Sequence, residues 1–350
     1  MTEPAASHRT PSKGAHVVTL PTYFDEARKN IEPGDDATNA KNAHADVSKF
    51  LKADSWFKSL GVDPYLIGSY AREVSIRRVK DVDVFARLRD AKPGLRPGEV
   101  LDRMNAVLTD AFGKDRVERQ FRSIMVNFPT YGLSVDAVPA RPCGDHWEIP
   151  NRPEHAKRAQ WVETNPIRLG ELTTAANQEF LLNDKGIYVP TVKLIRQIRR
   201  EWVDDQPGGL YFEILTYWAF QQTKPSENTV AEYLTTILAT IADQVLPEAV
   251  DHGLDDPTMP DKKITTKATD EQLLAALDRT REASALAQQA LGEDDDCRAA
   301  LAWQQLFGNT TEDEVVFPMP SYCNADGTWK SAGTITKGSR TVAAGTGRYA

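Results

Sequence analysis

The spacing of apolar residues changes partway along this 350-residue chain, and the change restricts the folds open to it. Up to about residue 140, short β-branched runs alternate with helical stretches. Beyond about residue 150 the spacing is helical, as in "ENTVAEYLTTILATIADQVL". The pattern predicts an α+β protein of two lobes, in which a mixed β-sheet with helices is followed by an all-helical part.

Four segments are expected along the chain. Residues 1–20 are a polar, flexible N-terminus, residues 21–150 form the lobe with the sheet, and residues 151–318 form the helical lobe. Residues 319–350 end in "SAGTITKGSRTVAAGTGRYA", which lacks the large apolar side chains needed for packing. We therefore expect a flexible C-terminal tail.

Bulk composition excludes several classes of protein. The formal net charge of −8 argues against a protein that wraps long nucleic acid by general attraction. We expect no membrane span and no secretion signal, and therefore a cytoplasmic protein. Three cysteines (Cys143, Cys297 and Cys323) are far apart and odd in number, so we expect bystanders rather than disulfides or a Cys-rich metal cage.

An acidic pair marks the candidate active site. In "DVDVFARL", Asp81 and Asp83 alternate with apolar residues, which predicts a strand with both carboxylates on one face. Their Cα atoms would lie ~6.6 Å apart, close enough to bracket a divalent ion. Oxygen ligands without nearby His or Cys suit Mg²⁺ or Mn²⁺. Taken alone, the tripeptide is more often the solvated face of an edge strand.

Two further features favour the metal site. Gly68 and Ser69 form a turn after a strand-like run, where backbone N–H groups and a hydroxyl can hold phosphate oxygens, although Gly-Ser is also an ordinary turn. Asp136 lies in "LSVDAVPA", a second strand-like run in which a lone charge is unusual. A third carboxylate there would complete a site for two ions.

A basic helix follows in the helical lobe. Lys193, Arg196 and Arg200 in "VKLIRQIRR" share one helix face and can grip a triphosphate, but a solvent-facing basic stripe is an equally good interpretation. The next stretch, "GGLYFEILTYWAF", predicts a buried helix, and Tyr211 near its start can offer an aromatic face to a base.

In this order the motifs resemble the nucleotidyltransferase superfamily. More closely, "GSYAREVSIRRVKDVDVFARL", "LSVDAVPA", "VPTVKLIRQIRREW", "YFEILTYWAF" and "AWQQLFG" resemble the bacterial cGAS/DncV-like nucleotidyltransferases (CD-NTases), over roughly residues 60 to 308. That family makes cyclic oligonucleotide signals in anti-phage defence (CBASS). Two positions depart from its pattern: Val74 stands where members often have Thr, and "GGLYFE" lacks a Ser often found there.

The resemblance implies a bilobal fold with an active site in the cleft. Asp81, Asp83 and Asp136 would ligate two Mg²⁺ ions, with Mn²⁺ as the other candidate. Gly68 and Ser69 match the phosphate-binding turn, and Lys193 matches the lysine that contacts the triphosphate. The expected substrates are nucleoside triphosphates, ATP or GTP among them, which need no long nucleic acid. Some members are regulated by enzymatic conjugation of the C-terminus, which makes conjugation machinery a candidate partner of Ala350.

The expected product is a cyclic di- or trinucleotide formed with release of pyrophosphate. Within the enzyme class the alternatives are linear oligoadenylate-type synthesis, tRNA end-addition, and a toxin that nucleotidylates a macromolecule. From another class, the alternative is a catalytically silent nucleotide-binding module. The presence of all three aspartates argues against the last of these.

Overall fold

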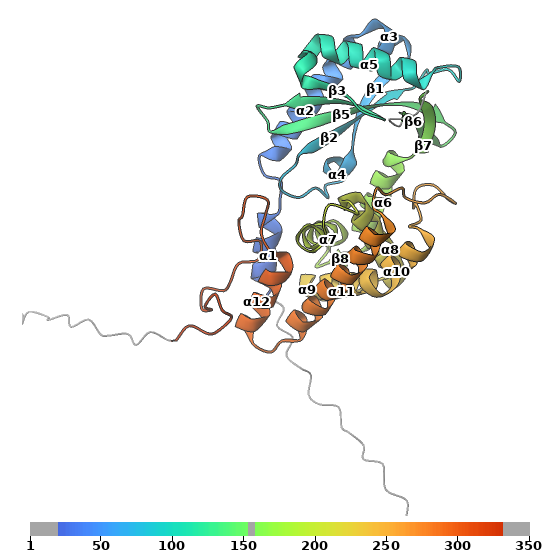
Figure 1. Cartoon of the computed structure of the whole chain (residues 1–350). Helices are drawn as coiled ribbons and strands as arrows, with labels where there is room; N and C mark the ends of the chain where they lie inside the picture. Colours follow the sequence, from blue (N-terminus) through green and yellow to red (C-terminus); the bar gives the residue numbers. More distant parts are fainter. Residues whose placement is uncertain (1–19, 153–157, 332–350) are drawn as a thin grey trace, which may run out of the picture.

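The computed structural model describes residues 20–152 and 158–331 of the chain. A lobe built around a β-sheet precedes a lobe of packed helices, and the two lie one above the other in Figure 1. The expected α+β, two-lobed architecture is therefore confirmed.

The N-terminal lobe contains a mixed sheet of seven strands in which β1, β2, β5, β4 and β3 are successive neighbours. β6 pairs with both β5 and β7 and extends the sheet toward the helical lobe. The β2–β5 pair is parallel and the other pairs of this sheet are antiparallel, including the β4–β5 hairpin. The strands are β1 (Val62–Ile67), β2 (Asp81–Leu88), β3 (Val117–Arg119), β4 (Ile124–Phe128), β5 (Leu133–Cys143), β6 (His146–Asn151) and β7 (Gln160–Thr164).

One face of this sheet is covered by helices α2 and α5. Val82, Val84 and Ala86 of β2 are fully buried in the cluster that these helices share with the sheet. Because side chains alternate along a strand, Asp81 and Asp83 project from the opposite face, toward the helical lobe. The helical elements of this lobe are α2 (Asp36–Ala53), α3 (Ser55–Ser59), α4 (Gly68–Ala71), α5 (Pro97–Phe112) and a 3₁₀ turn, η1 (Lys114–Arg116).

The sequence from residue 37 to about 60 has a helix-forming composition throughout, but the structure divides it into two helices. Asp54 adopts an extended backbone after α2, and its carboxylate accepts hydrogen bonds from the backbone N–H groups of Trp56 and Phe57. An aspartate in this position caps a new helix because it satisfies N–H groups that have no partner within the helix. The capped segment is α3.

The helical lobe packs around α7 and α8. The apolar sequence of α8 places Phe212, Ile214 and Leu215 in the core, as a helix with apolar residues on all sides requires. A short π-helix, η2 (Ile241–Val245), joins α9 to α10. The elements are α6 (Pro166–Glu179), the short strands β8 (Leu181–Leu182) and β9 (Lys185–Gly186), α7 (Tyr188–Trp202), α8 (Gly209–Thr223), α9 (Val230–Thr240), α10 (Leu246–His252), α11 (Asp270–Gly292) and α12 (Asp296–Phe307).

Helix α1 (Pro21–Asn30) packs with the helical lobe, although it precedes the sheet in the chain (Figure 1). The ring of Phe24 is fully buried and lies 4.9 Å from the ring of Trp303 in α12. We therefore propose a division in which α1 belongs to the helical lobe and β7 to the lobe with the sheet.

The expectation that all three cysteines are bystanders is wrong. Cys297 at the start of α12 forms a disulfide with Cys323, and their Cα atoms are 5.4 Å apart. A spacing of 26 residues gave no sign of this pairing, which arises because the segment after α12 folds back onto it. Cys143 is free.

The expected tail boundary at residue 319 falls inside this packed segment. Tyr322 stacks on Trp329 at 5.0 Å, and the indole of Trp329 donates a hydrogen bond to Asp295. The expected flexibility of residues 1–19 and 332–350 lies outside the described residues.

Among residues 20–152 and 158–331, every helix is too short or too polar to traverse a bilayer.

Candidate active site

Three aspartates lie on one face of the sheet, on two adjacent parallel strands. In the β2–β5 register, Asp83 is directly opposite Asp136, and Asp81 is opposite Ser134. Directly paired residues of neighbouring strands project to the same side, and the strands lie about 4.8 Å apart. The structure therefore places Asp136 on the same side of the sheet as the acidic pair.

Hydrogen bonds hold two of these carboxylates. The Ser134 hydroxyl donates to Asp81 Oδ1 over 3.1 Å. Ser123 lies 3.5 Å from Asp136 Oδ1 and donates a shorter bond, 2.8 Å, to Gln120. Asp81 is exposed, whereas Asp136 is partly buried.

The electrostatics of the cluster favour a bound cation. Burial and the neighbouring Asp136 carboxylate raise the pKa of Asp83 to about 6, against the opposing pull of the Arg72 guanidinium. Burial and the charge of Asp81 also raise the pKa of Asp136. Carboxylates that repel one another in a buried place are relieved by a divalent ion between them. Their oxygen-only donor set fits Mg²⁺ or Mn²⁺.

The Gly-Ser turn lies against this cluster. Ile67, the last residue of β1, pairs with Asp83, and Gly68 follows with a φ of +80°. A Cβ atom on Gly68 would lie 2.0 Å from Asp83 Oδ2, so the backbone can pass the carboxylate only if residue 68 is glycine. Ser69 lines the cleft next to it.

Replacing Gly68 with alanine should therefore damage the site directly. We expect Gly68→Ala to lower catalytic turnover about 100-fold, because Asp83 must move away from the added methyl group. The left-handed backbone adds a cost of about 1–2 kcal/mol to folding. Steady-state turnover and urea denaturation measure the two effects.

The control for this variant is Gly98→Ala. Gly98 lies in the first turn of α5, where an added Cβ would have no atom within 4 Å. Turnover of the control should match the parent protein. A Gly68→Ala enzyme as active as the control would show that Asp83 needs no fixed position.

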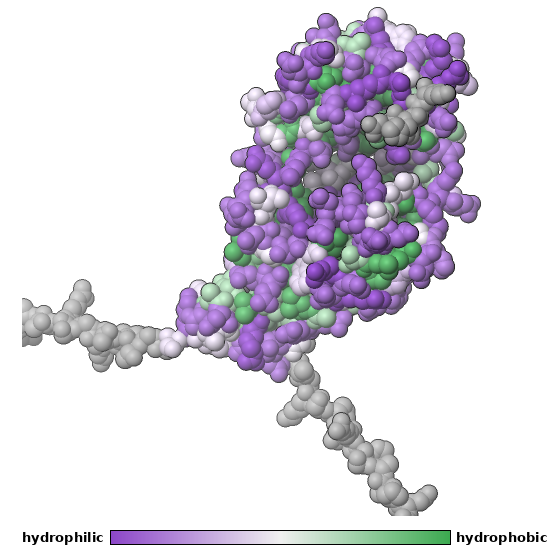
Figure 2. All heavy atoms as spheres, viewed as in Figure 1, coloured by the Kyte–Doolittle hydropathy of each residue, from purple (hydrophilic) through white to green (hydrophobic). Residues whose placement is uncertain are grey.

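A cleft of about 850 Å³ opens between the lobes beside Asp83. The sheet lobe contributes Gly68, Ser69, Asp83 and Trp161 to its lining, and the helical lobe contributes residues of α7, α8 and the loop after α10. Hydrophilic residues predominate on the face drawn in Figure 2. The lining cations are Arg72, Arg122, Arg196, Lys262 and Lys263. The lining also includes the carboxylates of Asp83, Glu148, Glu163 and Asp256, so the cleft has mixed charge, with cations beside the acidic cluster where a polyphosphate would lie.

The three cations expected to share one face of α7 have different surroundings in the structure. Arg196 lines the cleft, and its guanidinium lies 3.4 Å from Glu213. Lys193 lies outside the cleft lining, where Nζ contacts the Glu32 carboxylate at 2.7 Å. Arg200 donates hydrogen bonds to the Arg77 carbonyl and to Gln197. The role of Lys193 in binding a triphosphate stays a prediction, and it requires that the pair with Glu32 opens.

Tyr211 lies in the core of the helical lobe, with 4% of its surface exposed. Burial raises its pKa to about 12. Its neighbours Gly209 and Leu210 line the cleft instead, and Leu210 is exposed. Contact between Tyr211 and a base therefore also stays a prediction.

Arg72 lines the cleft, but the sequence motifs did not predict it as a site residue. Its guanidinium makes two hydrogen bonds to the Glu213 carboxylate, of 2.6 and 3.0 Å, and both side chains are buried. Arg72 follows the Gly-Ser turn by three residues, and Glu213 interrupts an apolar helix. A lone acid in such a helix requires a buried partner, and this was the available signal.

Comparison with known proteins agrees with this geometry. Residues 18–177 match the model of the SMODS family, the Second Messenger Oligonucleotide or Dinucleotide Synthetase domain. A protein of Acinetobacter sp. named Cyclic AMP-AMP-AMP synthase is 27% identical over 312 residues, covering 84% of this chain and 85% of that protein.

Solved structures share the fold. The Escherichia coli MS115-1 CdnC structure with ATP has a TM-score of 0.61 at 17% identity and covers 85% of this chain and 98% of that one. The Bradyrhizobium diazoefficiens CD-NTase CdnG in complex with GTP has a TM-score of 0.61 at 18% identity, with coverages of 82% and 94%.

The domain match and the fold define the chain as a nucleotidyltransferase. These findings confirm the resemblance noted from its motifs: residues 18–177 match the SMODS family model, and the chain shares its fold with solved cGAS/DncV-like nucleotidyltransferases, the CD-NTases.

Proposed function

We propose that this protein joins nucleoside triphosphates and closes the product into a cyclic di- or trinucleotide, with release of pyrophosphate, as a second messenger in bacterial anti-phage signalling. The observation that carries the proposal is the direct pairing of Asp83 with Asp136, on the sheet face that borders the cleft. The SMODS match to residues 18–177 supports the same reaction class.

Asp81, Asp83 and Asp136 are the proposed ligands of two Mg²⁺ ions. Ions bound there would lower the pKa of an attacking ribose hydroxyl and offset charge on the leaving pyrophosphate. Asp136 has a pKa raised by burial, which suits a carboxylate that accepts the hydroxyl proton. Ser69 and Arg196 line the same cleft, and we propose that they bind and orient the phosphates.

We propose ATP as one of the substrates. The curated relative carries the name Cyclic AMP-AMP-AMP synthase, and the similar CdnC was solved with ATP. The similar CdnG was solved with GTP, so the choice of base needs direct measurement. We propose the cytoplasm as the compartment, since nucleoside triphosphates are available there. Conjugation of the C-terminus concerns residues outside the described ranges and stays a prediction.

Product identification tests the proposal. We expect the protein, incubated with Mg²⁺ and the four labelled triphosphates singly and in pairs, to form a small product that resists phosphatase, because a closed ring has no terminal phosphate. Thin-layer separation followed by mass measurement identifies the bases and the ring size. Asp81→Ala/Asp83→Ala is the matched inactive variant.

Other products would assign the chain to another class. A phosphatase-sensitive ladder indicates linear synthesis, and label transferred to tRNA or protein indicates end-addition or a toxin. No turnover with Mg²⁺ or Mn²⁺ and all four triphosphates would indicate a silent nucleotide-binding module.

A further inference from the structure

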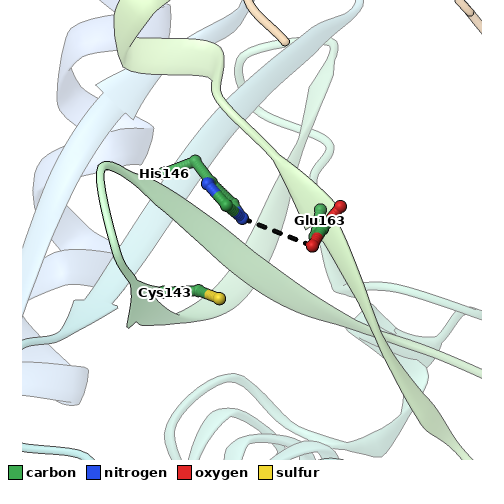
Figure 3. A group of neighbouring side chains, drawn as sticks. All are labelled: Cys143, His146 and Glu163. Atoms are coloured by element: carbon green, nitrogen blue, oxygen red, sulfur yellow. Dashed lines mark ion pairs between the residues drawn. The ribbon is translucent and has the colours of Figure 1, made fainter. Parts of the chain in front are cut away.

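A second group of side chains capable of binding a metal lies at the far end of β5. Cys143, His146 and Glu163 each present one ligand atom, and these atoms all lie within 4.8 Å of one another (Figure 3). Cys143 follows Asp136 by seven residues on the same strand, a distance of about 23 Å along an extended chain. The group is therefore separate from the three aspartates.

The backbone brings these residues to one face. In the β5–β6 hairpin, Cys143 is directly opposite His146, so their side chains share a face. Glu148 lies two residues further along β6, on that same face, and is directly opposite Glu163 of β7. His146 and Glu163 are thus diagonal neighbours, which is within reach of long side chains.

The imidazole of His146 is held in the manner of a metal ligand. Its Nδ1 lies 3.0 Å from Asp145 Oδ1. Its Nε2 is shielded from solvent and has no hydrogen-bond partner among residues 20–152 and 158–331, and Glu163 Oε1 lies 3.5 Å away. Ligating histidines commonly hydrogen-bond a carboxylate through one ring nitrogen while the other binds the ion.

Glu163 uses its two oxygens separately. Oε2 lies 2.9 Å from Lys262 Nζ, of the loop that lines the cleft. Oε1 is directed toward His146 Nε2. The carboxylate can therefore bind an ion through Oε1 and retain its contact with Lys262.

We propose that Cys143 Sγ, His146 Nε2 and Glu163 Oε1 form a Zn²⁺ site that is distinct from the catalytic aspartates. One sulfur, one nitrogen and one oxygen donor suit Zn²⁺ and disfavour Mg²⁺. Tetrahedral Zn²⁺ with bonds of about 2.0–2.3 Å separates its ligand atoms by about 3.3–3.8 Å. The 3.5 Å between His146 and Glu163 already fits, and a small rotation of Cys143 completes the set.

The position of the site gives it a structural role at the cleft. A bound ion joins the tip of the β5–β6 hairpin to β7, and the residues that follow Glu163, namely Thr164 and Asn165, line the cleft. The fourth coordination position is left to water, since three protein ligands are present.

Spectroscopy with Co²⁺ in place of Zn²⁺ tests the site independently of catalysis. Metal-free full-length protein is titrated with Co²⁺ in excess Mg²⁺, which occupies the aspartates. We expect one tight equivalent with thiolate-to-cobalt charge transfer in the near ultraviolet and the intense visible bands of tetrahedral Co²⁺, all removed by Zn²⁺. Cys143→Ser should abolish the charge transfer, and Glu163→Gln should weaken binding at least about tenfold.

The matched control is His252→Gln, at the exposed C-terminal end of α10, which should bind Co²⁺ like the parent. A second measurement needs no variant: Zn²⁺ should protect Cys143 from alkylation, read by mass spectrometry, because the other two cysteines are in a disulfide. Wild-type protein that gives no charge transfer, or a Cys143 alkylated equally fast with and without Zn²⁺, would overturn the proposal.

Discussion

Asp83→Asn is expected to abolish cyclic oligonucleotide synthesis while leaving the protein as stable as before or more stable. The substitution keeps the shape of the side chain and removes the negative charge that binds the metal. We expect turnover to fall at least about 10³-fold, the scale of losing a central electrostatic contact in a transition state. Turnover is measured as cyclic product formed per enzyme at saturating Mg²⁺ and triphosphate.

Although turnover falls, the free energy of unfolding should stay the same or rise, because the pKa of Asp83 is raised in the folded protein. Folding raises the pKa of Asp83 from 3.8 to about 6. In the metal-free protein, a charged Asp83 carboxylate therefore lowers the free energy of unfolding. This loss of stability is present in full above pH 6 and disappears as the pH falls from about 6 to 3.8, where the carboxyl is protonated in both states. Asparagine removes this loss at pH 7.5, which corresponds to a gain of up to about 3 kcal/mol in the free energy of unfolding.

A control separates these effects from the general loss of one acid. Asp110 is an exposed aspartate on α5, and Asp110→Asn should alter neither turnover nor the urea midpoint. Should Asp83→Asn retain more than a tenth of the parental turnover, Asp83 is not a metal ligand. Should it be inactive and unfolded, the raised pKa does not reflect a real cost of burial.

Local sequence patterns were sufficient to place the acidic pair. The alternation in "DVDVFARL" specified that Asp81 and Asp83 share a face, because the side-chain period of a strand is two. The same pattern placed Val82 and Val84 in the core. These are local properties of an extended chain and need no knowledge of its neighbours.

Other parts of the site depend on contacts between distant segments. Nothing near Asp136 indicates that it pairs with Asp83, since register is set by how β2 and β5 meet. Lys193 and Glu32 are separated by 161 residues, and their contact follows from the packing of α1 on the helical lobe. The helix sequence alone could not predict that Arg196 lines the cleft whereas Lys193 lies outside the lining.

The buried pair of Arg72 and Glu213 should dominate the coupling between the lobes. Glu213 is 1% exposed and also lies 3.4 Å from the Arg196 guanidinium. We expect Glu213→Gln to lower the free energy of unfolding by about 3–5 kcal/mol, because the buried Arg72 and the partly buried Arg196 lose their counter-charge. The shift in urea midpoint at constant slope measures the loss.

A surface pair and a double variant sharpen this test. Glu179 contacts Lys224 at 2.6 Å with both side chains about half exposed (48% and 51%), so Glu179→Gln should cost at most about 1 kcal/mol. Removing the stranded cation as well, in Arg72→Met/Glu213→Gln, should recover part of the loss, since charges in one network are not additive. If Glu213→Gln costs no more than Glu179→Gln, water reaches Arg72 and this buried pair does not hold the lobes together.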